Sequence, residues 1–227
     1  MGVIGIGFYN TLIYYSGQYT STHHMAIISS TAPIGTLLLA GIFGIERLSR
    51  YKIIGAACAF IGALVIVTNG DLIAIYSQEW NTGDIILIFS AFIWAAWSVA
   101  ITIKPKALST RSFLTVIIAI GVLFLAPLYA WDTYHGARTP FTIEAFSIFI
   151  YVGVMASVIA WFLWQHCVDT VGPVKTSLIY YSLPVFASVL AIILLNEPIE
   201  EYHVIGFMLV CVGIVISNLR KMGLVEK

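Results

Sequence analysis

Charged residues and cysteines are scarce in this chain, and each shortage excludes a class of protein. Only 10% of the 227 residues are charged, against about a quarter in a typical soluble domain. The 11 basic and 11 acidic residues balance, so the composition does not favour a nucleic-acid partner. The three cysteines, Cys58, Cys167 and Cys211, are an odd number within or beside apolar segments, which argues against a disulfide framework or a metal site.

Hydrophobic residues take the place of charge and make up 60% of the chain, with a mean hydropathy of +0.96. Apolar runs of about 18 or more residues predict membrane-spanning helices, because roughly 20 helical residues cross about 30 Å of hydrocarbon. Eight such runs lie at about residues 2–18, 25–44, 52–68, 85–103, 112–131, 145–166, 174–195 and 202–219. We therefore predict an all-α integral membrane protein with eight transmembrane helices in a lipid bilayer.

The basic residues predict the orientation of these helices. Ten of the 11 follow an even-numbered span, and only Arg138 lies in a loop of the other parity. Because cytoplasmic loops carry an excess of Lys and Arg, we expect a multi-pass protein of the cell (inner or plasma) membrane with a cytoplasmic C-terminus. The loops 19–24, 69–84, 132–144 and 196–201 would then face outward.

One short pattern occurs twice. Residues 44–55 (GIERLSRYKIIG) and 195–206 (LNEPIEEYHVIG) share a Glu, a Tyr and a terminal Ile-Gly, and a shift of 151 residues aligns about 58 positions. The two copies fall on opposite sides of the predicted membrane, which indicates inverted repeats with an odd number of helices each. We predict a complete five-helix repeat over 84–219 and a partial, three-helix repeat over 1–70, eight helices of an expected ten. The chain is then either an N-terminally truncated fragment or a reduced protein.

Three stretches carry a resemblance to a known family. They are APIGTLLLAGIFGIERLSRYKIIGAACAFIGALVIV, LPVFASVLAIILLNEPIEEYHVIGFMLVCVGIVIS and GDIILIFSAFIWAAWSVAI. Together with the repeat, they resemble EamA-type transporters of the drug/metabolite transporter (DMT) superfamily over essentially the whole chain. The resemblance implies a ten-helix bundle that exports or exchanges small metabolites. The chain departs from this pattern because the first two of the ten expected helices are missing.

Matched prolines mark the first candidate site. Pro33 and Pro184 occupy equivalent positions near the middle of their spans, and a proline inside a helix frees a backbone carbonyl. We expect both to act as hinges, although proline also kinks membrane helices without a functional role. The polar residues beside them are candidate substrate contacts in a cavity between the repeats: Ser29, Ser30, Tyr180 and Tyr181.

An aromatic and polar stripe is the second candidate site. Ser90, Trp94, Trp97 and Ser98 share one helix face, and Ser157, Trp161, Trp164 and Gln165 repeat that spacing. These stripes predict a cavity wall, or else aromatic residues that only pack or face lipid. The candidate wall residues are Trp94, Trp97, Ser98, Trp161 and Gln165, with Asn10 and Tyr14 at the equivalent positions of the first repeat.

Other polar residues favour structural roles. Glu46 and Glu197 end their spans and are expected to bond backbone or tyrosine groups, and solvation is the expected state of His23 and His24. The glycine pairs Gly55/Gly62 and Gly206/Gly213 are expected to allow close helix packing.

No Asp, Glu, Lys or Arg lies in the middle third of any predicted span, so a proton relay has no evident carrier in this sequence. This favours a facilitator or exchanger of neutral or zwitterionic solutes, amino acids among them, working by alternating access. We find no catalytic constellation and expect neither an enzyme nor a cofactor. A non-transporting membrane partner or an inactive fragment is the alternative, and a homodimer stays open.

Overall fold

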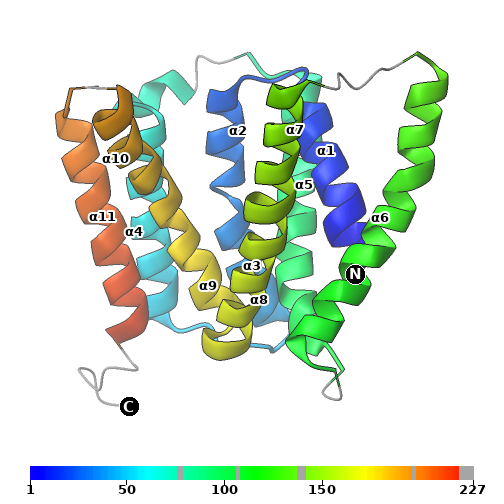
Figure 1. The fold of residues 1–227 in the computed structure, drawn as a ribbon. Helices are drawn as coiled ribbons and strands as arrows, with labels where there is room; N and C mark the ends of the chain where they lie inside the picture. The colour runs from blue at the N-terminus through cyan, green and yellow to red at the C-terminus, as the bar shows by residue number, and fades with distance from the viewer. Residues whose placement is uncertain (76–78, 106–107, 137–141, 196–197, 220–227) are drawn as a thin grey trace.

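The computed structural model describes residues 1–75, 79–105, 108–136, 142–195 and 198–219, and all regular elements in these ranges are helices (Figure 1). Seven helices in the described ranges are long and apolar enough to cross a membrane. They are α2 (Thr22–Ser29) with α3 (Ala32–Ile42), α4 (Arg50–Val67), α5 (Thr82–Ala100) with η3 (Ile101–Ile103), α6 (Thr110–Tyr134), α7 (Ile143–Ile150) with η4 (Tyr151–Ile159) and α8 (Ala160–Val171), α9 (Pro173–Ile179) with η5 (Tyr180–Ser182) and α10 (Leu183–Leu195), and α11 (Glu201–Asn218).

The N-terminal helix is shorter than its apolar run. It consists of η1 (Gly2–Phe8), of 7 residues, and α1 (Tyr9–Ser16), of 8 residues, which together fall below the roughly 17 residues that a span needs. A turn then leads to Ser21, whose hydroxyl oxygen accepts from the backbone N–H of His24 at 3.2 Å and caps α2. The described chain thus has seven full-length spans and one shorter helix where eight full spans are expected.

Two segments, η1 and η4, are π-helices. The 151-residue shift that aligns the two halves of the sequence places Gly2–Phe8 on residues 153–159, which lie within η4. The π-helix is rare and usually appears as a single bulge in an α-helix. Its occurrence at matched positions means that the halves share a backbone irregularity as well as residues.

Two spans break beside their prolines. Residues 30 and 31 separate α2 from α3, where Pro33 occupies the first turn. The 3-10 turn η5 separates α9 from α10, where Pro184 is the second residue. Proline lacks the N–H that would continue the helical ladder, so each span divides into two shorter helices.

The helices α4 and α11 cross in backbone contact at four glycines. A Cβ atom at Gly55 would lie 2.5 Å from the carbonyl oxygen of Gly213, and one at Gly62 would lie 2.7 Å from that of Gly206. Only a residue without a side chain permits such an approach. The expected close packing at these glycines is confirmed.

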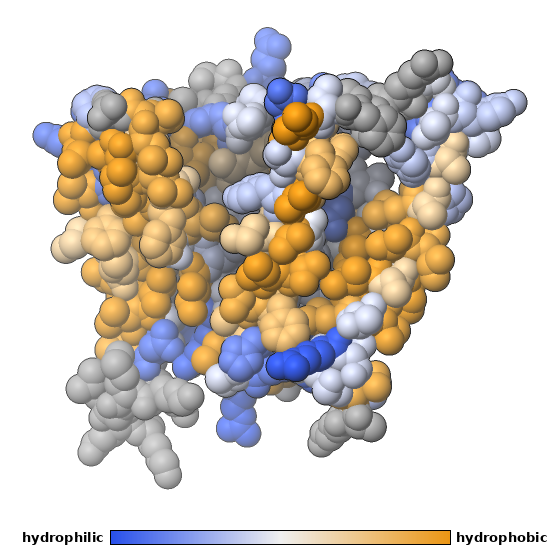
Figure 2. Space-filling model, in the orientation of Figure 1, coloured by the Kyte–Doolittle hydropathy of each residue, from blue (hydrophilic) through white to orange (hydrophobic). Residues whose placement is uncertain are grey.

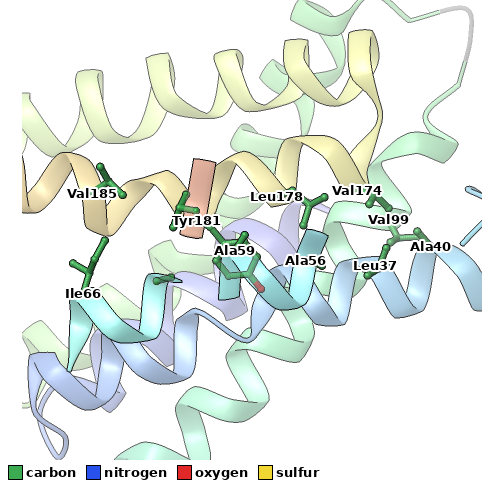
Figure 3. Packing of buried hydrophobic residues seen from close by; sticks show 12 residues of the cluster. Leu37, Ala40, Ala56, Ala59, Ile66, Val99, Val174, Leu178, Tyr181 and Val185 are labelled. Carbon is green, nitrogen blue, oxygen red and sulfur yellow. The ribbon is translucent and has the colours of Figure 1, made fainter. Parts of the chain in front are cut away.

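Apolar side chains form both the interior and the lipid-facing surface. Hydrophobic residues cover most of the visible face over the helices, and hydrophilic ones gather at its two ends (Figure 2). A buried cluster joins α3, α4, α5, α9 and α11, and its members include Leu37, Ala59, Leu178, Tyr181 and Val210 (Figure 3). A second cluster joins α5, α6 and α8 around Trp97 and Ile117.

Glu46 has the structural role expected of it. One carboxylate oxygen accepts from the Lys52 ammonium at 2.6 Å, and the other accepts from the backbone N–H of Val174 at 3.3 Å, at the start of α9. Its expected counterpart Glu197 lies outside the described residues.

Replacement of Gly62 by Leu is expected to lower stability by about 3 kcal/mol or more, because the new side chain meets backbone atoms that cannot move aside. Thermal unfolding of the purified chain in detergent measures this effect. Gly153→Leu is the matched control, since nothing lies within 4 Å of a Cβ atom there. Equal melting temperatures for the two variants would contradict the crossing.

Candidate functional site

A cavity of about 530 Å³ lies between α2, the end of α4, and the segment formed by η5 and α10. The broken spans bring together five of the predicted site residues at its wall: Ser29, Ser30, Tyr180, Tyr181 and Pro184. The remaining lining consists of Thr22, His23, Met25, Ala26, Ile66, Val67, Leu183, Ala187 and Ser188. The two helix breaks therefore meet at one cavity.

The cavity wall combines apolar side chains with hydroxyl groups and one imidazole, and it contains no Asp, Glu, Lys or Arg. The Ser30 hydroxyl donates to the Ala26 carbonyl at 2.7 Å, and the Ser188 hydroxyl donates to the Pro184 carbonyl at 3.0 Å. Each hydroxyl oxygen keeps the capacity to accept a further hydrogen bond. Such a wall suits a solute that offers hydrogen-bond donors and has no net charge.

Packed side chains close one end of this space. Tyr181 is 1% exposed; it lines the cavity and is also a member of the buried cluster (Figure 3). Beyond it, Leu37, Val174 and Leu178 fill the space between α3 and α9. The cavity is therefore placed toward the end of the bundle where α2 begins and α4 ends, the upper end in Figure 1.

The two predicted aromatic stripes face each other across α5 and α8. The ring centroids of Trp97 and Trp161 are 4.7 Å apart, and those of Trp94 and Trp164 are 5.1 Å apart. Tyr9 packs on Trp94 at 4.7 Å from the first helix. This cluster adjoins the cavity, because the ring centroids of Trp164 and the cavity residue Tyr180 are 6.4 Å apart in an edge-to-face arrangement.

Several polar atoms of this aromatic cluster are buried without a hydrogen-bond partner among the described residues. They are Trp97 Nε1, Ser98 Oγ, Trp164 Nε1 and Gln165 Oε1. The other side-chain atom of Gln165, Nε2, donates to Asp169 at 2.8 Å. Buried polar groups are nearly always paired in folded proteins, so these four atoms are the most conspicuous polar feature of the α5–α8 contact.

None of the seven residues predicted for the aromatic and polar wall lines this cavity: Asn10, Tyr14, Trp94, Trp97, Ser98, Trp161 and Gln165. Asn10 is half-buried and donates to the Ile6 carbonyl at 2.8 Å, and Tyr14 is 65% exposed. Ser98 is fully buried between helices. The second predicted hinge, Pro33, is buried at the start of α3 and does not line the cavity.

Sequence reasoning missed two features near the cavity. His23, Thr22 and Ser188 line it, and the position of Ser188 four residues after Pro184 was the available signal. His24, expected to be solvated, instead donates from Nδ1 to the Asp84 carboxylate at 2.9 Å, with a side chain 15% exposed. That carboxylate also accepts from the Thr20 hydroxyl and from the backbone N–H of Asn81.

Comparisons with known proteins agree with this architecture. A family model described as the EamA-like transporter family matches residues 1–68 and 81–219. The chain is 26% identical over 218 residues to the uncharacterized transporter YyaM of Bacillus subtilis, covering 96% of this chain and 71% of that protein. It is 24% identical over 224 residues to a probable terminal-alkyne amino-acid exporter of Streptantibioticus cattleyicolor, covering 98% of this chain and 72% of that protein.

A solved crystal structure has the same fold. It superposes with a TM-score of 0.81 at 16% sequence identity, covering 99% of this chain and 78% of the other. At this identity the likeness extends to the fold alone.

Replacement of Asp84 by Ala is expected to lower stability by about 1–3 kcal/mol, because Thr20, His24 and Asn81 would lose their common acceptor in a buried position. The midpoint of thermal unfolding in detergent measures this. Asp132→Ala, at an exposed residue of α6, should change the free energy of unfolding by no more than about 0.5 kcal/mol and leave the midpoint nearly unchanged. A midpoint equally unchanged for both variants would mean that Asp84 does not hold the start of α5 to α2.

Proposed function

The chain belongs to the EamA-like transporter family, and we propose that it exports or exchanges small metabolites without net charge, amino acids among them, through the cavity of α2, α4, η5 and α10. The observation that carries this proposal is a cavity placed where two broken spans meet, lined by apolar and hydroxyl side chains and without Asp, Glu, Lys or Arg. In transporters built from repeats, substrate sites lie at such discontinuous helices. Both comparisons point to a transporter rather than to an enzyme.

The proposed mechanism is alternating access between two inverted repeats, residues 1–70 and 84–219. Its support is the α4–α11 crossing. The 151-residue shift aligns Gly55 with Gly206 and Gly62 with Gly213. The observed contacts, 55 with 213 and 62 with 206, exchange with each other under that shift. A pseudo-two-fold axis produces this reciprocal pairing, and the matched π-helices and helix breaks are in keeping with it.

The state described here would be open toward the outside. The described basic residues Arg47, Arg50, Lys52, Lys104, Arg111 and Lys175 lie at one end of the bundle, with the end of α11. By the positive-inside tendency this end is cytoplasmic. The cavity is at the opposite end, so the buried cluster below Tyr181 would form the cytoplasmic gate, with Pro33 and Pro184 as hinges.

The proposed substrate class follows from the wall. Hydroxyl groups without a Lys or Arg beside them do not offset the desolvation of a polyanion. The apolar lining residues and the ring of Tyr180, by contrast, can contact an apolar side chain of the solute. The similarity to a relative named as a probable amino-acid exporter favours the same class.

Tyr180→Ala is expected to raise the KM for a transported amino acid about 2–10-fold, because the substrate would lose one aromatic contact. The measurement is efflux of labelled neutral amino acids from proteoliposomes that contain the full chain. Tyr151→Ala, at a residue 64% exposed on the outer surface of η4, is the control and should leave the KM unchanged. Efflux no faster than from protein-free liposomes for the whole amino-acid set would favour the alternative, a non-transporting membrane partner.

The orientation predicts which single cysteines an impermeant reagent reaches in intact cells. With Cys58, Cys167 and Cys211 replaced, Glu200→Cys should be labelled without permeabilisation, because Glu200 is exposed at the predicted outer end. Arg47→Cys, exposed at the other end, should be labelled only after permeabilisation. The opposite pattern would reverse the orientation.

A further inference from the structure

An apolar groove lies beside the cavity, between α10, α11 and the end of α4. It has a volume of about 210 Å³, and its wall consists of Ile66, Val185, Ser188, Val189, Ile192, His203, Val204 and Phe207. We infer that this groove holds an apolar chain of the transported solute while the polar head of the same solute occupies the cavity. The inference rests on the proposed function and narrows its substrate class to amphiphilic solutes.

The groove adjoins the cavity, because two residues belong to the walls of both. Ile66 and Ser188 line each of them. Ile66 is buried, and its side chain rests on the backbone of Gly206, where a Cβ atom would lie 2.4 Å from Cγ1 of Ile66. The α4–α11 crossing therefore holds Ile66 at the boundary between the two spaces, and one molecule can contact both of them there.

The two spaces differ in polarity. Hydroxyl groups of Ser, Thr and Tyr side chains occur along the cavity, whereas the wall of the groove beyond Ser188 is aliphatic or aromatic except for His203. Nδ1 of His203 accepts from the backbone N–H of Glu200 at 3.1 Å and so takes part in the cap of α11. The surface that the groove offers a ligand is therefore mainly apolar, next to a cavity that offers hydrogen bonds.

The groove is open toward the side of the bundle. Val189 of α10 and Val204 and Phe207 of α11 are exposed, and hydrophobic side chains cover the visible face over these two helices (Figure 2). Phe207 lies six residues after Glu201, the first residue of α11, or about 9 Å along the helix axis. In a bilayer, an apolar opening at this depth faces acyl chains rather than water, so an apolar chain can lie there without being hydrated.

The cavity beside the groove makes the solute a better occupant than a membrane phospholipid. A phospholipid would bring its phosphate to a wall without Lys or Arg, where nothing offsets the desolvation of that charge. An amino acid with an aliphatic side chain has no net charge and matches the change from a hydroxyl-bearing to an apolar wall. At about 30 Å³ for a water-sized group, the groove has room for roughly seven such groups, enough for a straight side chain of about four to six carbons.

Binding of a series of straight-chain amino acids tests the inference without a transport assay. L-Alanine, L-norvaline and L-norleucine are titrated by isothermal calorimetry into the full chain in nanodiscs, and empty nanodiscs measure partition into lipid. Each added methylene should tighten binding to the wild-type chain about threefold to fourfold, the effect of removing one CH₂ group from water. Norleucine should therefore bind about 30–60-fold more tightly than alanine, from three added methylenes.

Two variants separate the groove from the apolar lining of the cavity itself. Val204→Trp fills the groove from α11 and should lower the norleucine-to-alanine affinity ratio about fivefold or more. Val215→Trp is the matched control, because Val215 is on the same helix, outside the groove, and is 52% exposed against 55% for Val204. Phe207→Ala removes an exposed ring instead of adding one, and it should lower the ratio about 2–10-fold through the lost aromatic contact.

Equal ratios in the Val204 and Val215 variants, with no change in Phe207→Ala, would overturn the inference and leave the proposed function standing. A gain with chain length no larger than the partition into empty nanodiscs would do the same. A wild-type ratio near one, with a phospholipid that copurifies with the wild type and not with Val204→Trp, would assign the groove to a lipid chain instead. Binding of none of the three amino acids would overturn both the inference and the proposed function.

Discussion

The backbone contact between α4 and α11 is the constraint on which the rest of the bundle depends. Four glycines let the two helices approach until carbonyl oxygens of one meet Cα positions of the other. In lipid, helices gain little from hiding apolar surface from each other, so close van der Waals packing must supply the association. This pair also borders the cavity, because Ile66 and Val67 at the end of α4 line it.

Charge is separated along the bundle in a way that follows from the cost of desolvation. The described basic side chains sit at one end, and the buried Asp84 near the other is surrounded by hydrogen-bond donors from Thr20, His24 and Asn81. Between these ends, the polar groups at the cavity are hydroxyls, an imidazole and backbone. A carboxylate or ammonium at mid-membrane would need a partner or a bound ion, and the uncharged wall of the cavity avoids that need.

Much of this arrangement could be predicted from the sequence, because it follows from backbone chemistry. Apolar runs predicted the seven long spans, proline predicted the two breaks, and the repeated glycines predicted the α4–α11 contact. The residues that line the cavity were harder to predict from the sequence. Asn10 and Tyr14 were chosen by correspondence with the second half of the sequence, which does not specify the neighbours of a helix face. The His24–Asp84 bond joins residues 60 apart, and no local pattern marks such a pair.

The π-helix η4 has a mechanical consequence for the helix that follows it. A π-turn holds one residue more than an α-turn, and one residue corresponds to about 100° of rotation in an α-helix. If a π-turn of η4 rewound into an α-turn, α8 would rotate about its own axis with little translation. Trp161 and Trp164 would then swing away from Trp94 and Trp97, so that a local change of winding could separate the two aromatic faces while every transmembrane helix stayed intact.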